Sequence, residues 1–328
     1  MAPLEFGHPE YWHTRFTKDP DVFDWLLPSN CLDKHISKAI EASTDPSPWI
    51  HHIGCGTSAL SYHLRKLVKS PHQIHNTDFS VVAVDIGKRR EGELFGEENA
   101  SGQVHACRLE DSASATSPSS EHGTEDSNVA QGSRRSMRWS TINLLSLTDF
   151  TSLVSHDKPH PYTIIVDKST SDSISCVDDV AIILPYPLQP VTTSTVKASR
   201  TTGTISQAKV KVKVHALHLL AVHLAYTTAP GGRWFAVSYS GSRFPFLPPY
   251  PTSSDEGLLS AELLENGFVH PGRLWRLESH ERVEVPAVPA EEGRGKGGQG
   301  RGSAVVHRPQ VMHNLYVLVR TDLGLEMV

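Results

Sequence analysis

Apolar and polar positions alternate along the chain in a way that predicts strands and helices in turn. Apolar, β-branched runs predict strands, and leucines and valines at helical spacing predict helices. The predicted helices lie within 5–27 and 30–43, at Ala59–Lys69 and at Val214–Thr227. The predicted strands are Trp49–Ile53, Ser80–Val84, Met137–Leu145, Tyr162–Val166, Arg233–Ser240 and Asn314–Arg320. Strands that alternate with helices favour a mostly parallel α/β sheet covered on both faces.

Three polar stretches interrupt this pattern. Residues 99–136 are rich in Ser, Thr, Gly, Asp and Glu, residues 187–207 are rich in Thr and Ser, and residues 286–304 are of low complexity. Because such segments carry too little apolar surface to order themselves, we expect disordered insertions there. The hydrophobic fraction of 38% and the charged fraction of 20% are both low for a globular protein. We therefore expect a single domain over residues 1–328 that carries these insertions.

Composition and spacing argue against several other classes of protein. The formal net charge of -5 gives no reason to expect nucleic acid or a membrane as partner. The 4 cysteines are scattered and the 19 histidines mostly lack metal-site spacing, so no metal is expected. His215 and His218 are predicted to be surface or half-buried residues of a helix. The N-terminus lacks a signal-peptide pattern and Val214–Tyr226 is too short to span a bilayer, which favours a cytoplasmic protein.

Candidate ligand-binding residues come directly after predicted strands, at Gly54, Asp85, Asn143 and Asp167. In parallel sheets, ligands bind at the carboxyl ends of the strands. The glycines of the Gly54–Ala59 loop allow a tight turn and a close approach of the backbone to a ligand. The same loop also satisfies the dinucleotide-binding pattern GxGxxG/A, so a nucleotide-binding site is indicated without deciding which nucleotide it takes.

The other three residues suggest how such a ligand would be held. Asp85, at the end of its predicted strand, could accept hydrogen bonds from both ribose hydroxyls of a nucleoside. It lies farther from the glycines than the roughly twenty residues expected of an NAD-binding fold, which disfavours a dehydrogenase. Asn143 could bond an adenine edge through its amide. Asp167 and Lys168 place charge at the same edge of the sheet.

Several motifs follow one another in order along the chain: Tyr11-Trp12 with Phe16, Asp24-Trp25, GCGTSALSY at 54–62, Val84-Asp85, DKSTSD at 167–172 and APGGR at 229–233. This ordered set resembles the class I methyltransferases that depend on S-adenosylmethionine (SAM). Within that class it is similar to the eukaryotic lysine methyltransferases of translation elongation factor 1-alpha, the methyltransferase-like 13 group. The resemblance covers about 60% of the chain, with gaps at the three polar stretches.

The resemblance implies a Rossmann-like seven-stranded sheet, mostly parallel with an antiparallel last strand. It also implies SAM as cofactor and a protein substrate, elongation factor 1-alpha or a similar protein. Asp167 or Asp172 could then orient the acceptor amine or hold a water that takes its proton. The implied cofactor-binding residues come from the aromatic lead-in, the glycine loop and the strand ends: Trp12, Phe16, Trp25, Gly54, Cys55, Gly56, Ser58, Asp85, Asn143, Leu144 and Lys168.

Some residues depart from the family pattern. Thr57 replaces its asparagine, Asn143 its usual acid and Ser169 its glycine, while His51 and His52 stand where the family has aliphatic residues. Two alternatives therefore stay open. One is an NAD(P)-dependent oxidoreductase, because of the GxGxxA loop. The other is a catalytically silent interaction protein on a SAM-binding fold.

Overall fold

The computed structural model describes residues 6–101, 135–155, 161–191, 209–253, 257–285 and 311–328. The predicted insertion at 286–304 lies outside these ranges. Most residues of the predicted insertions at 99–136 and 187–207 also lie outside them. No helix in the described ranges is long and apolar enough to cross a membrane. Within the same ranges, no group of three or more His, Cys, Asp or Glu residues could hold a metal ion.

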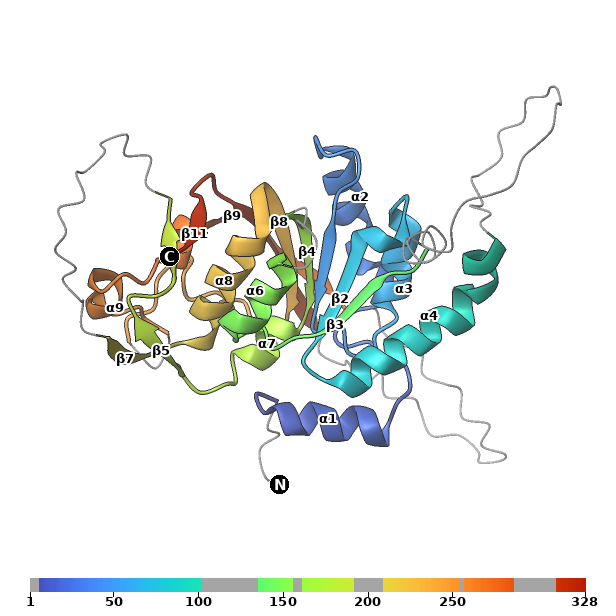
Figure 1. Ribbon diagram of the computed structural model, residues 1–328, viewed down its shortest axis with the longest axis horizontal. Helices are drawn as coiled ribbons and strands as arrows, with labels where there is room; N and C mark the ends of the chain where they lie inside the picture. The colour runs from blue at the N-terminus through green and yellow to red at the C-terminus, as the bar shows by residue number, and fades with distance from the viewer. Residues whose placement is uncertain (1–5, 102–134, 156–160, 192–208, 254–256, 286–310) are drawn as a thin grey trace, which may run out of the picture.

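A seven-stranded sheet forms the centre of the molecule (Figure 1). Its first five strands across are parallel, whereas β10 is antiparallel to both of its neighbours. In spatial order the strands are β3 (Arg138–Thr141), β2 (Ile74–Asp78), β1 (Ile50–Ile53), β4 (Tyr162–Lys168), β8 (Thr228–Ser238), β10 (Met312–Arg320) and β9 (Trp275–Glu284). This order confirms the predicted Rossmann-like class I methyltransferase sheet.

Helices cover both faces of the sheet, as predicted. Successive residues of β4 point to opposite faces, so Ile165 packs in one apolar core while Ile164 and Val166 pack in the other. The first core contains residues of α6 (Leu147–Ser155) and α8 (Ala216–Thr227), and the second those of α2 (Asp33–Glu41) and α3 (Leu60–Leu64). The remaining helices are α1 (Pro9–Lys18), α4 (Val81–Ser101), α7 (Thr170–Ile174) and α9 (Ala261–Glu265), with short 3-10 turns at Ser29–Leu32, Arg65–Leu67, Pro71–Gln73 and Pro271–Arg273.

The predicted second strand, Ser80–Val84, is wrong. The strand is Ile74–Asp78, and the apolar run after it begins helix α4. The strand was missed because its His, Asn and Thr side chains appear too polar for a buried strand. They are satisfied by hydrogen bonds inside the protein: His75 pairs with Tyr162 and Ser140, at 2.6 and 2.8 Å. Asp85 consequently lies exposed on α4 instead of ending a strand.

Other segments also differ from the sequence-based prediction. Part of the predicted loop 187–207 is a strand, β6 (Leu188–Pro190), which pairs with β11 (Leu325–Met327) after the predicted last strand. The charged strand β9 was missed, as were β5 (Val180–Leu184) and β7 (Val210–Val214). His218, predicted at or near the surface, is buried and its Nε2 lies 2.6 Å from the carbonyl oxygen of Gly257.

Five buried histidines make the fold sensitive to acid: His51, His52, His75, His218 and His223. Burial lowers the pKa of each, to between about 3 and 4 for the last four. The unfolded chain binds these protons near pH 6.5, so stability present above pH 6.5 is lost as the pH falls below it. Each histidine lowers the free energy of unfolding by roughly 1 kcal/mol between pH 6.5 and 5.5. Asp78 and Asp167, whose pKa values burial raises to about 6 and about 7, take up protons in the same range and offset roughly 2 kcal/mol of this loss. We therefore expect a net drop on the order of 3 kcal/mol.

Urea unfolding at the two pH values measures this drop. The His75→Gln variant should lose about 1 kcal/mol less than the wild type, because one proton-linked group is removed. Equal stability of the wild-type protein at pH 6.5 and 5.5 would contradict the expectation.

Candidate functional site

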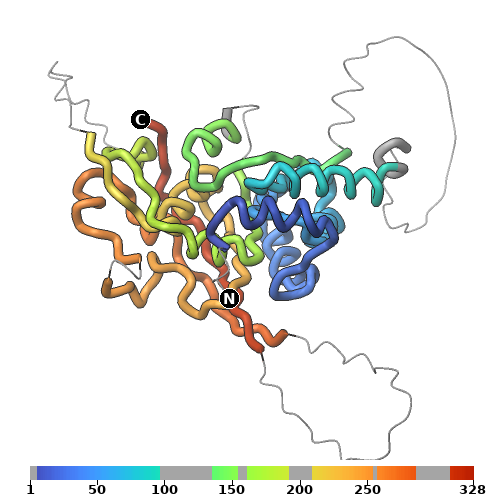
Figure 2. Tube along the Cα trace, turned by 90° about the horizontal axis from the view of Figure 1, so that it is seen from below, coloured from blue at the N-terminus to red at the C-terminus, as the bar shows by residue number. Residues whose placement is uncertain are grey.

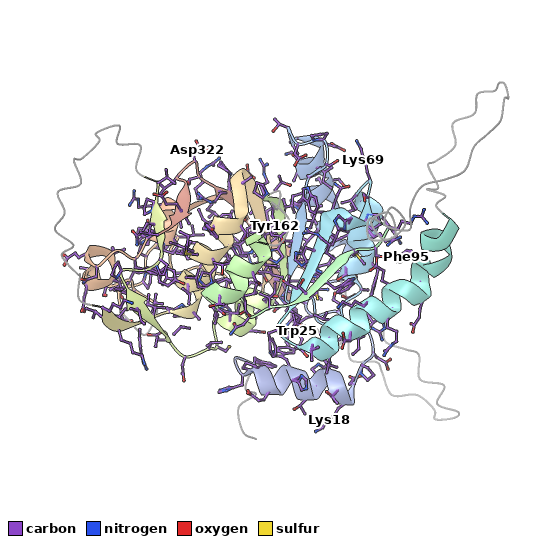
Figure 3. All side chains as sticks on the ribbon, viewed as in Figure 1. Lys18, Trp25, Lys69, Phe95, Tyr162 and Asp322 are labelled. Carbon is purple, nitrogen blue, oxygen red and sulfur yellow. The ribbon has the colours of Figure 1, made fainter. Side chains whose placement is uncertain are left out.

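A cavity of about 520 Å³ lies at the carboxyl ends of the parallel strands. Residues of the N-terminal segment 6–27 line it, and Figures 1 and 2 show α1 beside α4. Figure 3 shows Trp25 between α1 and the strand ends. The lining includes nearly all the predicted cofactor-binding residues: Trp12, Phe16, Trp25, Gly54, Cys55, Gly56, Ser58, Asn143, Leu144 and Lys168. Asp85 is absent from it.

The glycine loop turns sharply where β1 ends. Gly54 and Gly56 have φ angles of +54° and +50°, a region that side chains disfavour. A Cβ on Gly54 would collide with the side chain of Thr170, whose hydroxyl donates a hydrogen bond to the Ile53 carbonyl at 2.9 Å. Cys55 is buried, and its N–H donates to the Thr77 carbonyl at 3.0 Å. Glycine at position 54 thus lets the loop pack closely against Thr170, and the loop residues 54–58 line the cavity.

Asp78 takes the place that the sequence analysis gave to Asp85. It ends β2, lines the cavity and accepts hydrogen bonds from the N–H groups of Gly56 and Ser80, both at 2.9 Å. Burial raises its pKa to about 6. A signal in the sequence could have identified it, because Asp78 stands 22 residues after Gly56, near the spacing expected of a ribose-binding acid.

The loop after β3 forms the wall beside Asp78. Asn143 and Leu144 line the cavity, and the Ile142 N–H donates to the Asp78 carbonyl at 2.8 Å. The side-chain oxygen of Asn143 accepts from the Leu145 N–H at 3.0 Å. The Asn143 amide nitrogen makes no hydrogen bond with any residue that the structure describes, so a ligand could accept one from it.

An ion pair ties the N-terminal segment to the sheet. The buried Lys168 ammonium donates to an Asp24 oxygen at 2.8 Å and to the Leu27 carbonyl at 2.9 Å. The same Asp24 oxygen accepts from the Ser58 hydroxyl at 2.5 Å. Burial raises the pKa of Asp24, but the hydrogen bonds from Lys168 and Ser58 outweigh burial and hold that pKa below its usual value. Lys168 therefore closes the cavity instead of offering a free cation to a ligand.

Asp167, one of the two predicted catalytic acids, does not line the cavity. Its carboxylate is buried and accepts from the N–H groups of Thr170 and Ser171, at 2.8 and 3.2 Å, and from the Trp234 indole at 3.2 Å. Burial raises its pKa to about 7. These contacts hold the start of α7 against the sheet, and the carboxylate lies outside the cavity lining.

Asp172, the other predicted acid, does line the cavity but is engaged by the protein. It pairs with Arg243 at 2.7 Å and accepts from the hydroxyls of Ser169 and Ser238, at 2.7 and 2.5 Å. The Tyr239 N–H also donates to it at 3.3 Å. Asp172 thus fixes Tyr239, which lines the same cavity and which sequence reasoning missed together with Arg243.

Ser169 stands at a position where the resembled family has glycine. Its backbone conformation is one that favours glycine. Its φ angle is +73°, in the left-handed region that costs a side-chain-bearing residue roughly 1–2 kcal/mol. The hydrogen bond from its hydroxyl to Asp172 offsets part of this cost. The substitution is therefore accommodated without altering the turn between β4 and α7.

No family model matches the chain. Methyltransferase srdJ of Neurospora crassa is 26% identical over 179 residues, which are 55% of this chain and 58% of that protein. The chain thus matches little more than half the length of this curated relative. A solved SAM-dependent methyltransferase from Anabaena variabilis is 8% identical, with a TM-score of 0.42 over 98% of this chain and 96% of its own. The N-methyltransferase NodS from Bradyrhizobium japonicum is 10% identical, with a TM-score of 0.39 over 95% and 98%.

We expect the ion pair between Asp24 and Lys168 to be needed for stability. Asp24→Ala would leave a buried ammonium without its carboxylate, at a cost of about 3 kcal/mol. Asp21→Ala removes an exposed carboxylate 3.8 Å from Arg90 and should cost less than about 0.5 kcal/mol. Urea unfolding of both variants at pH 7.5 measures the difference, and equal losses would show that the buried pair contributes no more than the exposed one.

Proposed function

We propose that this protein is a SAM-dependent methyltransferase. The observation that carries the proposal is Asp78, which ends the second strand beside the glycine loop in a cavity at the carboxyl ends of the parallel strands. The resemblance to a curated methyltransferase over 179 residues supports it. The antiparallel β10 between β8 and β9 is the strand arrangement of class I methyltransferases.

The residues around the cavity suit the parts of SAM. The two Asp78 oxygens accept from the N–H groups of Gly56 and Ser80, and a carboxylate has further lone pairs that can accept from ribose hydroxyls. Asn143 could donate to adenine, and Gly54 and Gly56 leave room for the ribose and the methionine chain. The aromatic rings of the N-terminal segment, Trp12, Phe16 and Trp25, offer faces that attract a sulfonium cation.

Bound SAM would supply a methyl group on a cationic sulfur. The protein's own contribution is to align the acceptor and to exclude water. The aromatic segment 6–27, tied down by Asp24 and Lys168, would keep water from the reacting atoms. Because Asp167 and Asp172 are engaged by protein donors, neither serves as a free general base. An amine acceptor would therefore release its proton to solvent before transfer.

We propose a lysine side chain of elongation factor 1-alpha or a similar protein as the acceptor, on the strength of the ordered motifs. The cavity wall formed by Leu145, Ile174 and Val177 suits the aliphatic stem of a lysine. An apolar surrounding also disfavours the ammonium form, which cannot act as nucleophile.

Methyl transfer from radiolabelled SAM to purified elongation factor 1-alpha, and to a cell extract, tests the acceptor. We expect label in protein, and in a lysine after hydrolysis. Transfer of label only to small molecules of the extract would refute the protein-lysine proposal and leave the methyltransferase proposal standing.

An NAD(P)-dependent oxidoreductase is the second candidate, and one observation favours it. With Asp78 as the acid, the spacing from the glycines no longer disfavours a dinucleotide. Strand order argues against it, because the dinucleotide fold has the order 3-2-1-4-5-6 without an antiparallel strand inserted before the last one. The fluorescence of NADH should change on binding to a dehydrogenase and stay constant with this protein.

We expect Asp78→Ala to weaken SAM binding at least tenfold, which corresponds to about 1.4 kcal/mol, because the ribose hydroxyls lose their acceptor. Asp85→Ala, a matched control seven residues away on an exposed helix face, should leave the affinity unchanged. Titration calorimetry measures both. If the wild type does not bind SAM, the methyltransferase proposal fails, and if only Asp85→Ala weakens binding, the site assignment fails.

A further inference from the structure

A two-stranded ribbon of β5 and β7 stands apart from the central sheet (Figure 1). The strands are antiparallel, with Ala181 opposite Lys213 and Ile183 opposite Lys211. On the inner face, Ile182, Leu184 and Val214 are buried in the core that contains α8. The ribbon is therefore anchored, and its other face is held at a fixed position on the surface.

The outer face of the ribbon is basic. Lys209, Lys211 and Lys213 are all exposed, and the side chain across from Lys211 is Ile183, which is 55% exposed. No described carboxylate forms an ion pair with any of the three lysines. In a chain with a net charge of -5, this face is a local concentration of positive charge beside an exposed apolar side chain.

The ribbon also adjoins the cavity. Val177 lines the cavity wall and β5 begins at Val180, so the intervening chain spans at most about 10 Å. Val214 at the end of β7 pairs with Val180, so a partner on β7 would lie on the side of the molecule where Val177 lines the cavity.

We propose that the outer edge of β7 binds an extended acidic segment of a partner protein, added as a further strand. In the described part of the chain, β7 pairs with β5 alone, so the backbone groups of its other edge are open to a peptide. Acidic side chains at alternate positions of that peptide would face Lys211 and Lys213. Like charges on the lysine row oppose pairing with a second copy of β7, which leaves an acidic strand as its complement.

Fluorescence anisotropy with two labelled ten-residue peptides of the same composition tests this inference. In one peptide glutamate alternates with valine and threonine, and in the other the glutamates form one block. We expect the alternating peptide to bind the full chain at least tenfold more tightly than the block peptide. The Lys211→Glu/Lys213→Glu variant should lose at least tenfold in affinity. The control Lys66→Glu/Lys69→Glu, which makes the same change of charge at exposed positions elsewhere, should keep it.

Three results would overturn the inference: no binding of either peptide, equal losses in the two variants, or tighter binding of a ten-nucleotide single-stranded RNA than of the alternating peptide. The measurement uses no SAM, so its outcome is separate from that of the calorimetry. If the protein binds SAM but not the peptide, the outer edge of β7 is not a peptide-binding site. If it binds the peptide but not SAM, the methyltransferase proposal fails.

Discussion

The candidate site depends on the parallel pairing of β1 with β2 on one side and β4 on the other. Ile53, the last residue of β1, stands beside Thr77 and Asp167. Gly54, Asp78 and Lys168 follow Ile53, Thr77 and Asp167 in the chain. These three positions therefore meet at one edge of the sheet. A slip of one residue in either ladder would turn these side chains to the other face of the sheet and separate the loop from its acid.

Maintaining that register in polar strands requires internal hydrogen bonds. β1 and β2 are buried along their whole length, although five of their residues are His, Asn or Thr. His51 lies 3.0 Å from the Thr77 hydroxyl, and His52 lies 3.0 Å from Ser61 and 3.1 Å from Asn76. Such a network fixes how the strands pair, because a shifted register would leave buried polar groups unpartnered. His51 and His52 are thus part of what positions the glycine loop.

The same edge of the sheet is closed by a segment distant in sequence. Lys168 at the end of β4 is buried only because Asp24 and the Leu27 carbonyl reach it from the N-terminal segment. Trp12 and Trp25, with ring centroids 5.9 Å apart, then complete the aromatic wall. Asp167 and Asp172 hold the turn between β4 and α7, whereas Asp78 and the Asn143 amide are among the polar groups of the cavity lining that can face a ligand.

The sequence by itself determined the alternation of strands and helices, the glycine turn after Ile53 and the aromatic lead-in, because each depends on residues close together in the chain. Motifs in a fixed order also pointed to ten residues, predicted to bind a cofactor, that do line the cavity. Only the tertiary structure decided that Asp78 and not Asp85 ends the second strand, since the polar run Ile74–Asp78 becomes a buried strand when residues from β1, β3 and β4 satisfy its side chains. It likewise decided which acids are free, because Arg243 and Trp234, far along the chain, are the groups that engage Asp172 and Asp167.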